Sequence, residues 1–186
     1  MLHRIGLVAL LIAILSPAGA GAEPPLAQYA TGQLQNLAVH DTPKPPSDAT
    51  FRDGSGTEIG FDAFRGKVVL VNLWATWCAP CRHEMPSISR LQDMRGGDDF
   101  LVAAISVDRG GAEKSLAFLQ EVDADNLPLF VDPTTRIGRA LGAYGLPITV
   151  LLNRQGEEVA RLVGPAEWDS PEALALIDVL IADGAS

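Results

Sequence analysis

The chain of 186 residues is long enough to bury a hydrophobic core and is typical of one domain rather than two. Hydrophobic residues make up 47% of it and charged residues 20%, a composition that argues against intrinsic disorder. Its formal net charge of −9 argues against nucleic acid and anionic membrane surfaces as main partners.

The N-terminal residues 1–22 have the layout of a secretory signal. A weakly basic start precedes an apolar run at 5–15, and small residues follow, with an A-x-A cleavage site at 20–22. The apolar run is shorter than the roughly 20 residues that span a bilayer, and an uncleaved N-terminal anchor over 5–22 is the alternative. Either form places the rest of the chain in the periplasm, which is an oxidising compartment.

Residues 23–47 are predicted to precede the main domain as a helix and a linker. Apolar residues recur there at intervals of three and four, which predicts an amphipathic helix over 26–38. A proline-rich stretch at 42–47 predicts an extended, semi-rigid connector. The main domain itself is predicted to cover residues 48–186.

This domain begins with two short strands over 51–59, joined by an Asp-Gly turn, which form an N-terminal β-hairpin extension. Apolar, β-branched runs then alternate with segments of helical spacing. Strands are predicted from residue 68 and at 100–107, 127–131, 146–152 and 157–163, with helices over 82–94, 112–122, 133–141 and 171–181. The order β-α-β-α-β-α-β-β-α predicts an α/β fold with a mixed sheet flanked by helices. A C-x-x-C after the first core strand of such a sheet resembles the thioredoxin arrangement.

The two cysteines, Cys78 and Cys81, lie where the first buried strand passes into a helix. At the first turn of that helix, free backbone N–H groups and the helix dipole stabilise a thiolate on Cys78. Cys81 lies on the same face, deeper and more shielded. We therefore expect Cys78 to attack a disulfide and Cys81 to resolve the mixed disulfide, with this redox-active pair as the only cofactor. A purely structural disulfide is the alternative, but so small a loop adds little stability.

Residues around the pair are predicted to support this chemistry. Glu84 shares the helical face of the cysteines and is either a solvated carboxylate or a buried acid that manages the proton of Cys81. Pro147 either begins a strand or lies in cis beside the cysteines, where Leu146 offers backbone groups to an extended substrate. Substrate contacts are also assigned to the turn that carries the cysteines, at Trp77, Ala79 and Pro80.

A metal site is the competing interpretation of the same turn. His83 follows Cys81 closely, so a copper- or zinc-binding chaperone is an alternative class of function. Two cysteines and one histidine are too few ligands for a closed structural zinc site. Positions 81 and 83 also do not share a helical face. No metal site is therefore predicted.

The stretch 74–86, with the pattern W-x-x-W-C-x-P-C-x-x-E-x-P, resembles the TlpA/ResA branch of thioredoxin-like proteins. These are exported thiol-disulfide oxidoreductases of bacteria. Residues 66–72 are similar to the lead-in strand of that branch, and 145–149 to its cis-proline loop, although Ile148 stands where the family more often has Thr. The segment 164–168 resembles TlpA in particular.

The resemblance implies a role for each matching residue. Cys78 corresponds to the nucleophile, Cys81 to the resolving thiol and Pro147 to the cis-proline. Glu84 matches the active-site glutamate of the ResA side of the branch. Asn72 occupies the place of a buried acid in cytosolic thioredoxins, so proton handling is expected to follow another route.

The resemblance also implies a reductant that works in the periplasm. TlpA-type members keep copper-delivery proteins and the oxidase copper subunit reduced, and this role in cytochrome oxidase copper-centre assembly is the leading prediction. ResA-type members reduce apocytochrome c, which makes cytochrome c maturation the alternative. A membrane electron donor of the DsbD/CcdA type is expected to recharge the protein, and no nucleic acid partner is expected.

Overall fold

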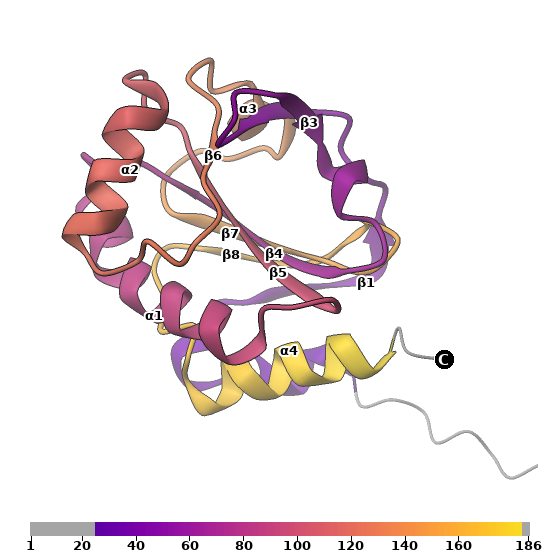
Figure 1. Ribbon diagram of the computed structural model, residues 1–186. Coiled ribbons are helices and arrows are strands. Elements are labelled where there is room, and N and C mark those ends of the chain that lie inside the picture. Colours follow the sequence, from indigo (N-terminus) through magenta and orange to yellow (C-terminus); the bar gives the residue numbers. More distant parts are fainter. Residues whose placement is uncertain (1–24, 184–186) are drawn as a thin grey trace, which may run out of the picture.

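The computed structural model describes residues 25–183 (Figure 1). The signal segment predicted over 1–22 therefore lies outside the described residues. Among the residues that are described, no helix combines the length and the apolar character needed to cross a membrane.

A mixed sheet forms the centre of the described part of the chain. Its strands are β1 (Ala38–Lys44), β2 (Thr50–Asp53), β3 (Glu58–Gly60), β4 (Val68–Trp74), β5 (Phe100–Ser106), β6 (Phe130–Val131), β7 (Ile148–Leu152) and β8 (Glu158–Val163). They lie in the order β1-β8-β7-β4-β5-β6-β2-β3. The helices are α1 (Ala79–Arg95), α2 (Gly111–Glu121), α3 (Arg136–Ala140) and α4 (Pro171–Asp183), with 3-10 turns η1 (Leu26–Tyr29), η2 (Gly32–Leu34) and η3 (Phe61–Phe64). The predicted order of elements from β4 onward is confirmed.

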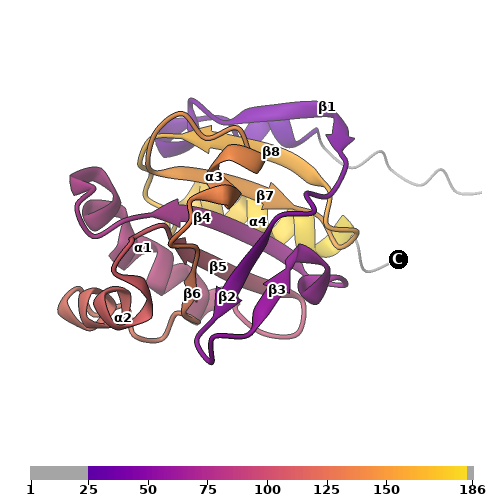
Figure 2. The ribbon, with the colours of Figure 1, turned by 90° about the horizontal axis from the view of Figure 1, so that it is seen from above.

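Strand β4 lies inside the sheet and leads to the cysteines. It runs parallel to β5 and antiparallel to β7, and every one of its residues is buried. Its run of Val and Leu suits a strand that is covered on both faces. Helices α1 and α4 lie side by side on one face of the sheet, joined by an ion pair between Arg95 and Asp178 (Figure 1). Helix α3 lies on the opposite face (Figure 2).

The predicted N-terminal β-hairpin extension is present as β2 and β3. The carboxylate of Asp53 accepts hydrogen bonds from the backbone N–H groups of Ser55 and Thr57 and so closes the turn. Strand β2 also pairs with β6, so the hairpin extends one edge of the sheet. An aromatic cluster fixes it there, formed by Phe51, Phe61, Phe64 and Phe130.

The helix predicted over 26–38 is wrong, and the first part of the connector predicted at 42–47 belongs to a strand. Only the short turns η1 and η2 form, and β1 then pairs antiparallel with β8 along the other edge of the sheet. The backbone of Gly32 is not helical, since its φ is +52°, and a Cβ at this position would clash with the Glu172 carboxylate. The apolar side chain of Leu34 is nevertheless fully buried. The spacing of apolar residues thus indicated that Leu34 is buried, but the predicted helical backbone does not form.

Two boundaries further along the chain also differ from the prediction. Helix α3 begins at Arg136 rather than at 133, because the Asp132 carboxylate first accepts the N–H of Thr134 in a turn and then that of Ile137. Strand β7 begins at Ile148 rather than at 146. The two preceding residues therefore form a loop beside the cysteines.

Candidate active site

The cysteines lie at the junction of β4 and α1 and form a disulfide. Cys78 is the N-cap of α1, and its Sγ accepts the backbone N–H of Cys81 at 3.3 Å. Ala79 and Pro80 form the first turn, where proline removes no hydrogen bond because the first amides have no partner within the helix. Cys81 is completely buried and Cys78 is 5% exposed. The predicted difference in shielding is confirmed, while the roles of nucleophile and resolving thiol stay predictions.

The N-terminus of α1 favours negative charge on Cys78. A thiolate at the N-cap faces unpaired N–H groups and the positive end of the helix dipole. The first turn carries no acidic residue that would oppose this. The geometry therefore supports nucleophilic attack by Cys78 once the disulfide has been reduced.

Asp108 holds the loop that carries the cysteines. Its carboxylate accepts hydrogen bonds from the N–H of Thr76 at 2.6 Å, from the Thr76 hydroxyl at 3.1 Å and from the Lys114 ammonium at 2.8 Å. Burial alone would raise the pKa of Asp108, but the bonds from Lys114 and Thr76 outweigh it and lower that pKa. Sequence reasoning missed this residue. The sequence does contain a signal for it, because Asp108 directly follows the apolar strand predicted at 100–107. This strand is β5, which runs parallel to β4, so its carboxyl end lies beside that of β4.

Glu84 is a buried acid, not a solvated one. Its side chain is 1% exposed and accepts hydrogen bonds from Asn72 Nδ2 at 2.8 Å and from the backbone N–H of Ala166 at 3.2 Å. Burial raises the pKa of Glu84 to about 7, even though both hydrogen bonds lower it. An acid one turn from Cys81 that titrates near neutral pH is suited to proton transfer.

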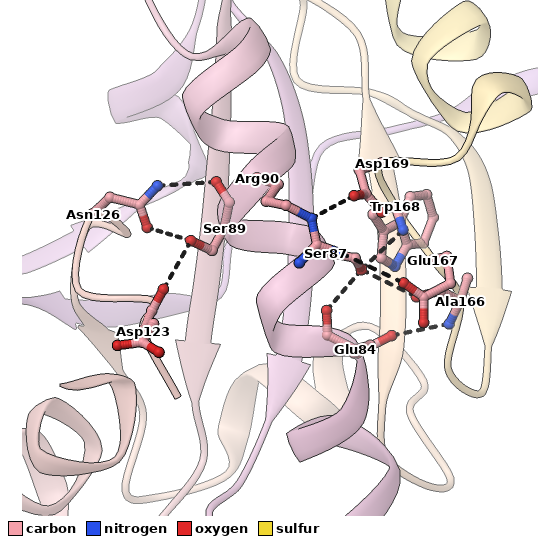
Figure 3. A network of polar contacts seen from close by, with 10 residues as sticks. All are labelled: Glu84, Ser87, Ser89, Arg90, Asp123, Asn126, Ala166, Glu167, Trp168 and Asp169. Atoms are coloured by element: carbon pink, nitrogen blue, oxygen red, sulfur yellow. Dashed lines mark hydrogen bonds and ion pairs between the residues drawn. The ribbon is translucent and has the colours of Figure 1, made fainter. Parts of the chain in front are cut away.

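The segment 164–168 closes over this side of α1. Ser87 donates its hydroxyl to the backbone oxygen of Glu84 and accepts the N–H of Trp168 at 3.0 Å (Figure 3). The indole ring of Trp168 is fully buried. This segment therefore covers Glu84 and supplies the Ala166 N–H.

Asn72 links Glu84 to the sheet. Its Nδ2 donates both to Glu84 and to Thr149 Oγ1 on β7, at 2.8 and 3.0 Å. Its Oδ1 is buried and has no hydrogen-bond partner among the described residues. Asn72 is therefore a hydrogen-bond donor to Glu84 on α1, and the buried acid lies on the helix and not at position 72.

The peptide bond between Leu146 and Pro147 is cis, as one of the two predicted readings of Pro147 requires. Pairing of Leu73 with Ile148 places this loop at the carboxyl end of β4. Neither the N–H nor the C=O of Leu146 makes a backbone hydrogen bond among the described residues. These two groups are therefore free to pair with an extended peptide.

Two of the four predicted substrate-contact residues, Trp77 and Leu146, line one cavity of about 640 Å³. Trp77 directly precedes Cys78, so the cavity adjoins the turn that carries the cysteines. Trp77 is 69% exposed, whereas Trp74 is buried against Phe118. Ala79 and Pro80 are exposed on the first turn of α1 but do not line this cavity. Among residues 25–183, no group of three or more His, Cys, Asp or Glu side chains is placed to hold a metal ion.

A disulfide at a strand–helix junction beside a cis-proline, on a mixed sheet flanked by helices, defines a thioredoxin-like protein. The family model named Redoxin matches residues 41–177, and the chain belongs to this family.

Curated relatives carry names from thiol-disulfide exchange. The thiol:disulfide interchange protein HelX of Rhodobacter capsulatus is 32% identical over 117 residues, which cover 61% of this chain and 64% of HelX. The thioredoxin-like protein YneN of Bacillus subtilis is 30% identical over 69% of this chain and 74% of its own length. The thiol-disulfide oxidoreductase ResA of Geobacillus kaustophilus is 30% identical over 59% of this chain and 62% of its own length. The match thus spans less than two thirds of HelX and ResA.

Solved structures show the same fold. A DsbF homologue from Corynebacterium diphtheriae superposes with a TM-score of 0.64 at 23% identity, over 79% of this chain and 92% of that one. A secreted thiol-disulfide isomerase from Corynebacterium glutamicum does so with a TM-score of 0.62 at 24% identity, over 77% and 92%. These likenesses support the thioredoxin-like fold predicted from the sequence.

Proposed function

We propose that this protein is an exported thiol-disulfide oxidoreductase that reduces disulfides in other periplasmic proteins. The observation that carries the proposal is the Cys78–Cys81 disulfide at the N-terminus of α1, beside the open backbone groups of Leu146. The names of the relatives HelX and ResA support the same activity. The proposal needs no cofactor other than the cysteine pair.

The proposed reaction begins with both cysteines reduced. The Cys78 thiolate attacks one sulfur of the substrate disulfide, the S–S bond breaks, and the departing substrate thiolate takes up a proton. Glu84 then removes the proton from the Cys81 thiol. The Cys81 thiolate attacks Cys78 and releases the second substrate thiolate, so the substrate gains two electrons and the Cys78–Cys81 disulfide forms. A membrane electron donor of the DsbD/CcdA type is proposed to reduce it again.

Cytochrome oxidase copper-centre assembly is the specific pathway that we propose. The resemblance of segment 164–168 to TlpA supports it, and Ala166 of this segment donates its N–H to Glu84. The proposed substrates are therefore copper-delivery proteins and the oxidase copper subunit. Reduction of apocytochrome c is the second candidate, and the ResA relatives favour it.

A trapping experiment distinguishes the two pathways. Cys81→Ser removes the resolving thiol, so this variant is expected to hold its substrate as a mixed disulfide on Cys78 in the periplasm. Mass spectrometry of the trapped species identifies the partner, and Cys78→Ser is the matched control. Partners held by Cys78→Ser but not by Cys81→Ser would show that the nucleophile is assigned wrongly.

The reduction potential tests the direction of electron flow. We expect a value near about −270 mV, as in a thioredoxin that acts as a reductant. Equilibration with glutathione buffers, followed by quantification of free thiols, measures it. A value near about −120 mV would make the protein an oxidant and would contradict the proposal.

A further inference from the structure

The cavity lined by Trp77 and Leu146, which adjoins the turn that carries the cysteines, is basic although the chain as a whole is acidic. Arg109 and Arg139 line it, together with Lys114. The formal net charge of the chain is −9, with 23 acidic and 14 basic residues. The two arginines therefore give this cavity a local positive charge that is opposite in sign to the net charge of the chain.

These two arginines are not neutralised within the described structure. Seven of the described basic side chains pair with carboxylates within ion-pair distance, namely Lys44, Arg82, Arg90, Arg95, Lys114, Arg154 and Arg161. The side chains of Arg52, Arg65, Lys67 and Arg136 also have no carboxylate partner among the described residues, but none of them lines the cavity. Among the described residues Arg109 has no such partner, and Arg139 bonds only to the Thr135 hydroxyl and the Thr134 carbonyl. Both guanidinium groups are free to bind an incoming carboxylate, which they match with paired N–H donors.

The one acid of the cavity lining does not compensate them. Asp108 is 2% exposed, and its carboxylate is occupied by Thr76 and Lys114. The Asp108–Lys114 pair is neutral as a unit. The rim therefore keeps the positive charge of Arg109 and Arg139.

The remainder of the lining suits a peptide. Trp77 and Tyr144 are exposed aromatic side chains on the rim, and Leu73 and Val107 form a buried apolar floor. Leu146 adds unpaired backbone groups beside them. Aromatic rings and free main-chain groups are typical of surfaces that bind an extended chain.

We propose that this cavity selects substrate segments that carry an acidic side chain next to the disulfide, which Arg109 and Arg139 bind. The inference rests on the proposed reductase function and specifies its substrate class. The carboxylate does not take part in the thiol exchange. It holds the segment while the substrate disulfide meets Cys78.

The test uses sets of three peptides that differ in one residue flanking a cystine loop, which is Glu, Gln or Lys. In one set this residue lies on the N-terminal side of the loop, and in the other on the C-terminal side. Fluorescence anisotropy measures the binding of cysteine-free versions of these peptides to the oxidised protein, so binding is measured without any reaction. Reduction of the disulfide versions by the reduced protein is followed separately. Because Gln is uncharged, reduction of the Gln peptide measures the reductase activity without any contribution from a charged flanking residue.

We expect the Glu peptide to bind about fivefold more tightly than the Lys peptide at low salt on at least one side of the loop. High salt should remove this preference because it screens exposed charges. The double variant Arg109→Gln/Arg139→Gln should lose it, and Arg109→Lys/Arg139→Lys should retain part of it. The control Arg52→Gln/Arg65→Gln removes the same charge outside the cavity and should retain the full preference.

Equal binding of the Glu, Gln and Lys peptides by the wild-type protein would overturn the inference. Equal loss of the preference in the control double variant would also overturn it, since the effect would then come from net charge. Failure to reduce the Gln peptide would contradict the proposed function, while the anisotropy result would still decide whether the cavity prefers acidic segments.

Discussion

Glu84 shows how burial and hydrogen bonding compete at one carboxyl group. Asn72 and the Ala166 N–H both favour its ionised form, but their effect is smaller than the loss of hydration in a nearly inaccessible site. The acid therefore titrates near neutral pH, with its pKa raised to about 7. In this state it can accept a proton from a thiol and release it again near neutral pH.

The raised pKa of Glu84 makes stability depend on pH. Because the carboxyl group is protonated more readily in the folded chain, its stabilising contribution is full below the unfolded pKa of 4.5 and is lost as pH rises through about 7. We expect the free energy of unfolding of the wild-type protein to fall by about 3 kcal/mol over this range relative to Glu84→Gln. Urea unfolding of both oxidised proteins between pH 4.5 and 8 measures this, with the cysteines held as a disulfide.

The comparison must use the slope with pH and not the absolute stability. Both neighbours of Glu84 are donors, so a Gln side chain turns its own NH₂ group toward one of them at a cost that is independent of pH. A pH profile that is parallel for the two proteins would show that Glu84 keeps an ordinary pKa.

The segment before the hairpin is packed into the fold. Turn η2 packs on α4, where the Gln33 N–H donates to Glu172 at 2.6 Å and Leu34 is fully buried. Strand β1 then covers the edge of β8, where Glu158 bonds to His40 and Arg161. Strand β1 is itself the edge strand of the sheet, and its Pro43 and Lys44 disfavour pairing with another chain.

Leu34→Ala tests whether this segment belongs to the core. We expect the free energy of unfolding to fall by about 2–5 kcal/mol, because the change leaves a cavity under η2. Leu116→Ala on α2 is the matched control, since Leu116 is 43% exposed and should change stability only slightly. Equal, small effects of both substitutions would show that the segment around Leu34 does not contribute to the core.

The molecule from η1 to α4 shares one hydrophobic core. The buried residues form a single cluster that includes Leu34 before the sheet, Trp74 within it and Leu180 at the last helix. The active site draws on distant parts of the chain, since the cysteines follow β4, Asp108 follows β5 and Pro147 precedes β7. Its geometry therefore depends on the whole sheet being formed.

A single cooperative unfolding transition is expected from this shared core. Far-UV circular dichroism, which reports on secondary structure, and tryptophan fluorescence, which reports on the buried indole rings of Trp74 and Trp168, should give coincident urea curves. Two separated transitions would show that residues 25–47 and the thioredoxin-like domain unfold independently.

Much of the architecture could be predicted because its signals are local. The apolar run of β4, the alternation of strands and helices after it, and the β2–β3 turn at Asp53 are encoded in neighbouring residues. The C-x-x-C at the start of α1 also identified the reactive pair. The hairpin, the element order and the mixed sheet are therefore present as predicted.

The amino-acid sequence by itself thus determined the element order, the cysteine pair and the cis-proline candidate, because each depends on residues close together in the chain. Only the tertiary structure decided that Glu84 is buried, that Asp108 holds the cysteine loop, and that residues 38–44 form a strand. In each of these cases the deciding partner lies far away in the sequence, at Ala166, Thr76 or strand β8. Solvation and strand pairing depend on what surrounds a residue in space, and a local pattern does not contain that information.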